Sequence, residues 1–99
     1  MKRAGIQSFK DDVVEEFFIK GTLRGKVGWA NVKGMVMRKL DMLDYAQQLA
    51  DLLSPPGNRL EVLKGEYSGN YSIRVNDQWR IVFEWTSVGP SNVRVVDYH

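Results

Sequence analysis

Hydrophobic residues recur with a helical period in the first half of the chain. The apolar residues of 13–18 are spaced as on one face of a helix, and they follow an aspartate pair at 11–12, a residue type that caps helix starts. Gly21 is typical of a helix end, and the glycine-rich segment 21–29 is expected to be a mobile loop. A second stripe, at spacings of three and four, predicts one main helix over 30–53.

In the second half of the chain, after Pro55 and Pro56 end the predicted helix, hydrophobic residues alternate with polar ones. A period of two is typical of strands with one buried face. Strands are expected at 60–63, 71–75, 79–85 and 93–98, with a weaker edge strand at 6–9. The sequence therefore predicts one compact α+β domain, 1–99, in which two helices from the N-terminal half pack on one face of a mostly antiparallel sheet of 4–5 strands.

The turn at 76–78 determines which residues of the two central strands face each other. A loop of three residues pairs Arg74 with Arg80. Only this register places the apolar residues of both strands on one face. The two guanidinium groups are then expected side by side on the face away from the helices, or at its margin. Either a bound anion or nearby carboxylates such as Glu84 must balance their charge.

The last three residues, Asp97, Tyr98 and His99, combine an acid, an aromatic ring and the one histidine of the chain. If the last strand returns after a loop over 86–92, Tyr98 falls opposite Arg80 and His99 falls opposite Trp79. Histidine titrates near neutrality and suits proton transfer, and Asp97 and the terminal carboxylate are expected to favour its imidazolium form. The alternative is a terminal histidine that is merely exposed to solvent.

Composition narrows the chemistry. The 99 residues are 43% hydrophobic and 26% charged, which is ordinary for a globular domain, and no apolar run approaches the length of a membrane span or forms a signal peptide. With no cysteine and a single histidine, we expect no disulfide, no metal centre and no cofactor.

The net charge is only +2, but the bases are unevenly distributed. No acid occurs between Glu16 and Asp41, and this stretch contains six bases: Lys20, Arg24, Lys26, Lys33, Arg38 and Lys39. Such a stretch is either a solvated surface or a surface that binds phosphate groups or an acidic partner.

Several short segments form a specific combination. They are PPGNRL at 55–60, LKG at 63–65, YSIRVNDQWR at 71–80 and DYH at 97–99, with IQSF at 6–9 and RKL at 38–40. In this combination the chain resembles the HigB-type toxins of the RelE superfamily over nearly its whole length, and least over 10–37.

The resemblance implies a RelE-like fold and the toxin of a type II toxin–antitoxin system. It implies a cytoplasmic endoribonuclease that cuts translated messenger RNA in the ribosomal A site and so inhibits translation and growth. It also implies a HigA-type helix-turn-helix antitoxin as partner, with operator DNA contacted only through the antitoxin complex. No membrane partner and no cofactor are implied.

Five positions match the family's catalytic residues: Lys64, Arg80, Asp97, Tyr98 and His99. Arg74 and the six bases between 20 and 39 are further candidates for RNA contact. Glu61 occupies a position that is histidine in some relatives. Its carboxylate cannot replace an imidazolium in holding phosphate, so Glu61 is expected to be either a base or a structural residue.

The chemistry implied is attack of an RNA 2′-OH on the adjacent phosphorus, which needs a base, cations and an acid for the leaving oxygen. Lys64 and Arg80 would stabilise the developing negative charge. His99 would donate a proton or contact phosphate, with Asp97 as the base or as the residue that orients His99. Tyr98 would stack on a nucleobase.

Three other functions fit part of the same pattern. The first is a non-catalytic toxin of the same fold, like the ParE-type gyrase poisons, although these lack the basic and terminal histidine set. The second is a nucleic-acid-binding module without cleavage. The third is an inactive relative kept for antitoxin binding, which the glutamate at position 61 leaves open.

Overall fold

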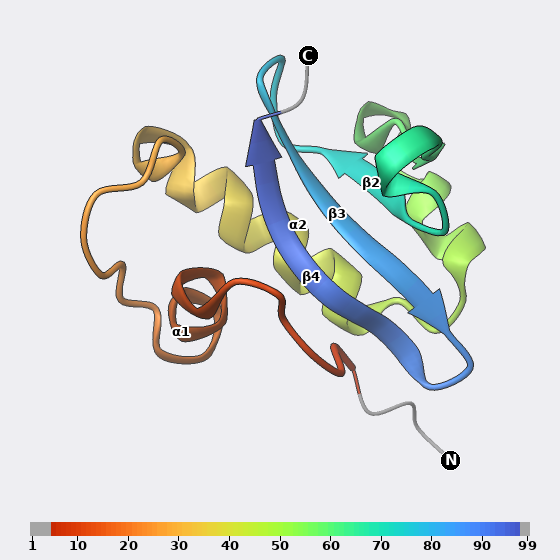
Figure 1. The fold of residues 1–99 in the computed structure, drawn as a ribbon, viewed down its shortest axis with the longest axis horizontal. Helices are drawn as coiled ribbons and strands as arrows, with labels where there is room; N and C mark the ends of the chain where they lie inside the picture. The colour runs from red at the N-terminus through yellow and green to blue at the C-terminus, as the bar shows by residue number, and fades with distance from the viewer. Residues whose placement is uncertain (1–4, 98–99) are drawn as a thin grey trace.

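The computed structural model describes residues 5–97. The helices are α1 (Asp12–Lys20) and α2 (Lys33–Tyr45), with short 3-10 turns η1 (Ala30–Val32), η2 (Leu49–Leu53), η3 (Pro56–Asn58) and η4 (Gly65–Tyr67). The strands are β1 (Glu61–Val62), β2 (Tyr71–Arg74), β3 (Trp79–Thr86) and β4 (Gly89–Asp97). They form one antiparallel sheet in the order β1-β2-β3-β4 (Figure 1). The predicted α+β architecture is confirmed.

Helix α1 begins and ends where the sequence predicts. The Asp11 carboxylate accepts a hydrogen bond from the backbone N–H of Val13 at 2.8 Å, which satisfies one of the donors that a helix start leaves free. Gly21 ends the helix in the left-handed conformation, with φ of 76°, and its N–H donates to the Phe17 carbonyl.

The predicted single helix over 30–53 is wrong, because the chain leaves the helical path after Tyr45. Ala46 is extended, with ψ of 130°, and the Asp51 carboxylate accepts from the N–H groups of Gln47 at 2.8 Å and Gln48 at 3.2 Å. These bonds start η2 as a separate turn. The predicted apolar stripe lies in or against the core up to Ala46, but its last two members, Ala50 and Leu53, are exposed, and Leu49 and Leu52 pack in or against the core instead.

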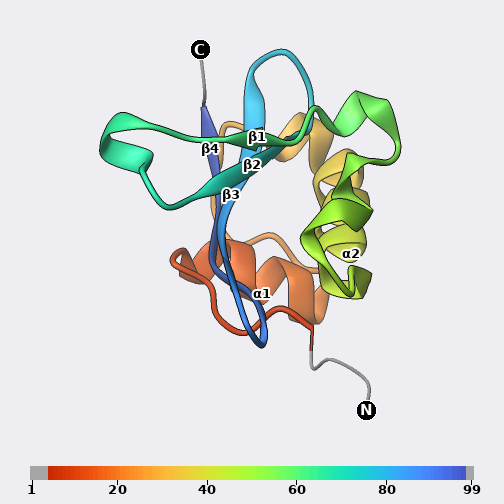
Figure 2. The same cartoon turned by 90° about the vertical axis from the view of Figure 1, so that its right-hand side faces the viewer.

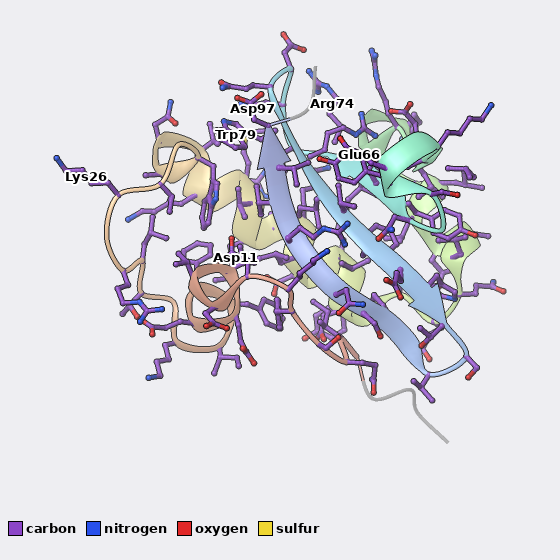
Figure 3. The ribbon with its side chains drawn as sticks, viewed as in Figure 1. Asp11, Lys26, Glu66, Arg74, Trp79 and Asp97 are labelled. Carbon is purple, nitrogen blue, oxygen red and sulfur yellow. The ribbon has the colours of Figure 1, made fainter. Side chains whose placement is uncertain are left out.

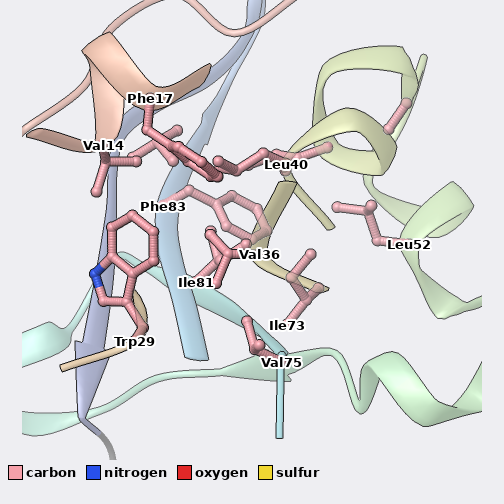
Figure 4. Close-up of a cluster of buried hydrophobic side chains, with 13 residues drawn as sticks. Val14, Phe17, Trp29, Val36, Leu40, Leu52, Ile73, Val75, Ile81 and Phe83 are labelled. Carbon is pink, nitrogen blue, oxygen red and sulfur yellow. The ribbon is translucent and has the colours of Figure 1, made fainter. Parts of the chain in front are cut away.

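One face of the sheet, the inner face, packs on the helices and forms the core (Figure 4). Its buried residues include Ile73, Ile81 and Phe83, and the alternation of β2 and β3 places them on the same side. The predicted register of this hairpin is confirmed, because Ile73 faces Ile81 and Arg74 faces Arg80. The opposite face, the outer face, therefore carries Arg80.

Strand β4 begins earlier than the sequence predicts. The expected loop over 86–92 is wrong, because Thr86 already pairs with Gly89 in a tight hairpin. An irregularity between Val82 and Glu84 then shifts the register along β3.

This shift changes which residue of the last strand lies beside Arg80. Val96 faces Arg80 and Asp97 faces Trp79. The predicted pairings of Tyr98 with Arg80 and of His99 with Trp79 are therefore wrong, since Val96 faces Arg80 and Asp97 faces Trp79. Residues 98 and 99 themselves lie outside the described part of the chain.

The predicted strand over 6–9 is reduced to a single parallel bridge between Phe9 and Val93. The segment still runs along the free edge of β4, because the Gln7 N–H donates to the Pro90 carbonyl at 2.8 Å and the Val93 N–H donates to the Ser8 carbonyl at 3.1 Å. The free edge of β4 is thus partly covered. Between residues 5 and 97, no helix is long and apolar enough to cross a membrane.

The sheet separates α2 from η4 (Figure 2). In Figure 2, α2 lies to the right of the sheet, on its inner face, whereas the loop that contains η4 projects to the left, on the other side. The outer face is thus bordered by η4 near β1 and by the C-terminal end of β4 (Figure 1).

Candidate functional site

The Arg80 guanidinium is held rigidly on the outer face of the sheet. Its Nε donates to Ser72 Oγ at 2.7 Å, and its Nη2 donates to the Arg59 carbonyl at 2.5 Å. Its Nη1 lies 3.0 Å from a carboxylate oxygen of Glu61. Arg80 is only 7% exposed, and these contacts compensate the burial of its charge.

Glu61, rather than the expected Glu84, balances the charge of Arg80. Glu61 follows Leu60 into β1 and pairs with Ser72, which brings its side chain beside the Arg80 guanidinium. Glu84 instead accepts a hydrogen bond from Asn92 at 3.0 Å. The prediction that carboxylates balance the arginine charges is confirmed, but the carboxylate named was wrong. The position of Glu61 depends on how β1 pairs with β2, which the sequence pattern does not reveal.

Arg74 is balanced by a residue of its own hairpin. Its guanidinium makes a close ion pair with the Asp77 carboxylate in the turn. The Asp77 side chain is fully exposed, so solvent screens the pair and it contributes little to stability. Figure 3 shows Arg74 at the same end of the molecule as Trp79 and Asp97.

Arg94, for which the sequence pattern predicted no role, covers the centre of the outer face. Its Nη1 donates to Asn70 Oδ1 at 3.0 Å and to the Asn92 carbonyl at 2.7 Å. The side chain thus spans from β4 across β3, which explains why Val82 is fully buried although it faces away from the helices. Burial lowers the pKa of the Arg94 guanidinium, while the charges of nearby Glu84 and Tyr67 act in the opposite direction.

Lys64 and Asp97 lie at opposite edges of the sheet. Lys64 lies two residues after the end of β1, at the N-cap of η4, and its side chain is exposed. Within residues 5–97 its ammonium group has no hydrogen bond or ion pair. Asp97 ends β4 and accepts a hydrogen bond from Gln78 Nε2 at 2.9 Å.

Asp97 lies at the end of β4, one position beyond Val96, which faces Arg80. Tyr98 and His99 lie outside the described residues. Of the five predicted catalytic residues, the structure describes three. Contacts to its neighbours hold the Arg80 side chain, Lys64 lies just after β1, and Asp97 ends β4.

The six bases between 20 and 39 do not form one surface. Arg24 lies 3.8 Å from Glu16 of α1, and Lys20 lines a shallow hollow of about 370 Å³ that also includes Asp12 and Glu15. Lys26 extends from the loop before α2, on the side of the molecule away from Arg74 (Figure 3). Lys33 is exposed at the start of α2.

Arg38 and Lys39 lie on α2. The Lys39 ammonium donates to Asn58 Oδ1 at 2.6 Å. Burial lowers the pKa of Lys39, and the nearby positive charges of Arg38 and Arg74 lower it further. Cations from α2 and β2 are therefore brought close together, although they are far apart in the sequence.

Asn58 and Arg59 also contribute to the site, although the sequence indicated them only as part of the 55–60 segment. Asn58 is fully buried, and its Nδ2 donates to the carbonyls of Leu52 at 3.2 Å and Ser54 at 3.3 Å. Arg59 then adopts a left-handed conformation, with φ of 45°, and turns its carbonyl toward Arg80. The signal available in the sequence was an asparagine directly after a Pro-Pro-Gly turn.

No group of three or more histidine, cysteine, aspartate or glutamate residues that could hold a metal ion occurs in the described range 5–97.

Comparison with known proteins defines the class. The structure resembles a solved YoeB–YefM complex from Staphylococcus aureus, with a TM-score of 0.57 and 18% identity over 98% of both chains. This similarity shows the fold alone. The family model for HigB-like toxins, described as the RelE-like toxin of type II toxin–antitoxin system HigB, matches residues 7–99.

Relatives agree with the family model. Toxin HigB-1 of Vibrio cholerae is 43% identical over 77 residues, which cover 78% of this chain and 80% of the relative. Endoribonuclease HigB of Proteus vulgaris is 30% identical over 94 residues, which cover 95% of this chain and 99% of the relative. The chain belongs to the HigB-like toxin family of type II toxin–antitoxin systems, as the sequence pattern predicted.

Proposed function

We propose that this toxin is an endoribonuclease that cuts translated messenger RNA in the ribosomal A site. The observation that supports it most is the fixed guanidinium of Arg80, with Asp97 at the end of β4, one position beyond Val96, which faces Arg80. A relative of similar length carries the name Endoribonuclease HigB, which agrees with this activity.

The proposed reaction is transfer of a phosphoester bond within the RNA. The 2′-oxygen attacks the adjacent phosphorus, a base takes the 2′-OH proton, and the bond to the 5′-oxygen breaks as that oxygen receives a proton. The products are a 2′,3′-cyclic phosphate and a 5′-hydroxyl. Asp97 and His99 are the proposed proton-transfer residues, and Arg80 with Lys64 stabilises the negative charge that develops.

Glu61 is proposed to be structural in this scheme. The ion pair with Arg80 fixes the guanidinium plane and offsets part of its charge. A general base needs access to the 2′-OH proton, whereas this carboxylate oxygen already faces a cation at 3.0 Å. This supports the second of the two roles that the sequence left open.

We further propose that the ribosome positions the RNA, because the described site consists of a few side chains on an open sheet face. Tyr98 would stack on a nucleobase there. A HigA-type antitoxin would block the toxin in the cytoplasm and take the complex to operator DNA. The YoeB structure was solved with its partner YefM, which is consistent with an antitoxin as partner.

The test is cleavage of a defined messenger RNA, read by primer extension, with and without ribosomes. Wild-type protein should cut only with ribosomes, and His99→Ala should lower the rate by more than about tenfold, because general acid–base groups contribute on that scale or more. Ser87→Ala, on the exposed turn between β3 and β4, is the matched control and should cut normally. Intact message with folded wild-type protein would instead favour a gyrase poison or a binding module.

A further inference from the structure

A group of cations from three parts of the chain meets at the β2 side of the sheet. We define the basic edge as Arg38, Lys39, Arg59 and Arg74. These residues come from α2, from the turn after η3 and from the end of β2, and η3 lies against β2. No sequence segment contains them together, so the basic edge exists only in the fold.

Two hydrogen bonds and one strand pairing connect the basic edge to the candidate site. Lys39 bonds to Asn58 at 2.6 Å, the next residue is Arg59, and the Arg59 carbonyl accepts from Arg80 at 2.5 Å. Arg80 in turn faces Arg74 across the β2–β3 pair. The basic edge is thus continuous with the site at Arg80.

The charge of the basic edge is incompletely balanced. Asp77 pairs with Arg74 and Glu61 pairs with Arg80, but Lys39 has a neutral amide oxygen as its partner. Arg38 and Arg59 are exposed, and in the described residues neither has an ion pair. Clustered cations that repel one another are stabilised by a polyanion, whose phosphates replace the missing carboxylates.

We propose that the basic edge binds the backbone of single-stranded RNA and guides it toward Arg80. This inference rests on the proposed function, because it takes Arg80 as the place of the reacting phosphate. A chain of phosphates fits better than one acidic side chain, since the cations extend from α2 to β2 rather than surrounding one point. The bases at Lys20 and Arg24 are less suited to this contact, because acids of α1 lie beside them.

The test measures binding rather than cleavage. A fluorescent single-stranded RNA with 2′-O-methyl riboses, which lack the attacking hydroxyl, is titrated with free toxin and followed by anisotropy. Arg38→Gln and Arg74→Gln should each weaken binding about three- to tenfold, and the double variant should lower the salt dependence of log K by about 1.4, or 0.7 for each phosphate contact.

Lys10→Gln is the charge-matched control. Lys10 is exposed and its N–H bonds to Val93 of β4, so it lies beside the opposite edge of the sheet. The affinity of Lys10→Gln for the RNA should stay within about twofold of that of the wild type. Equal losses in Lys10→Gln and Arg74→Gln would mean a general charge effect and overturn the proposal.

A glutamate-rich peptide of the same length is the second ligand. If it binds as tightly as the RNA and depends equally on Arg38 and Arg74, the basic edge is a site for an acidic protein segment and the RNA proposal fails. The binding assay measures no cleavage, so its results would stand even if the toxin proved not to be an endoribonuclease. Conversely, if the wild type cuts RNA but the variants bind RNA as tightly as the wild type does, the proposal for the basic edge fails while the proposed endoribonuclease activity stands.

Discussion

At the scale of single residues, Arg80 and Glu61 show what the sequence could and could not predict. The hairpin parity correctly placed Arg80 beside Arg74, because alternation and turn length are local properties. The pairing of Arg80 with Glu61 depends on where β1 docks, which is a long-range contact. The sequence therefore predicted that carboxylates balance these arginines, but not which ones.

The Glu61–Arg80 pair leads to a stability prediction. Glu61→Ala leaves Arg80 Nη1 without its carboxylate and should lower the free energy of unfolding by about 1–3 kcal/mol, because a buried donor loses its partner. Glu61→Gln keeps an acceptor and should cost less than about 1 kcal/mol. Urea denaturation monitored by circular dichroism gives both values.

Glu66→Ala is the control, because Glu66 is an exposed glutamate on η4. Its effect should stay within about 0.5 kcal/mol. If Glu61→Ala costs no more than Glu66→Ala, the ion pair does not hold Arg80. If Glu61→Gln abolishes cleavage without loss of stability, Glu61 is a base after all.

At the scale of elements, the segment between α2 and β1 was the least predictable. The apolar spacing indicated one helix over 30–53, yet Asp51 redirects two N–H groups and breaks it at Ala46. A side chain that competes for backbone donors leaves the hydrophobic period unchanged. The caps of α1 at Asp11 and Gly21, by contrast, follow from residue type alone and were predicted correctly.

The Asp51 contacts predict a pH dependence. Hydrogen bonds from the N–H groups of Gln47 and Gln48 lower the pKa of Asp51 below its ordinary value. A lowered pKa stabilises the fold above the ordinary pKa, and this contribution is lost as pH falls through the folded value. The Tm difference between wild type and Asp51→Asn should thus be largest at neutral pH and shrink below about pH 4. A constant difference would contradict this role.

Asn58 predicts how the same segment supports the site. Asn58→Ala removes donors to two carbonyls and the acceptor of Lys39, and it should cost about 1–3 kcal/mol of unfolding free energy. Cleavage should also fall, because the Arg59 carbonyl no longer fixes Arg80. Asn31→Ala, at an exposed asparagine of η1, should change neither quantity. Equal stability of the two variants in thermal unfolding would refute this role of the 55–60 turn.

At the scale of the whole molecule, the antiparallel sheet with helices on one face was predictable from the change of hydrophobic period near Pro55. The convergence of Arg38, Lys39 and Arg74 was not, because it depends on how α2 crosses the sheet and on the η3 turn between them. The family relationship agrees with the fold as a whole. The chemistry depends on the few residues around Arg80 and on the terminal segment.

The most direct test of the account uses ribosomes programmed with two messenger RNAs. They differ by one atom, a 2′-hydroxyl or a 2′-hydrogen at the nucleotide before the scissile phosphate in the A site. The account predicts cleavage of the ribose message, with a 2′,3′-cyclic phosphate end, and an intact deoxyribose message. Equal cleavage of both messages, or cleavage of neither by folded toxin, would contradict it.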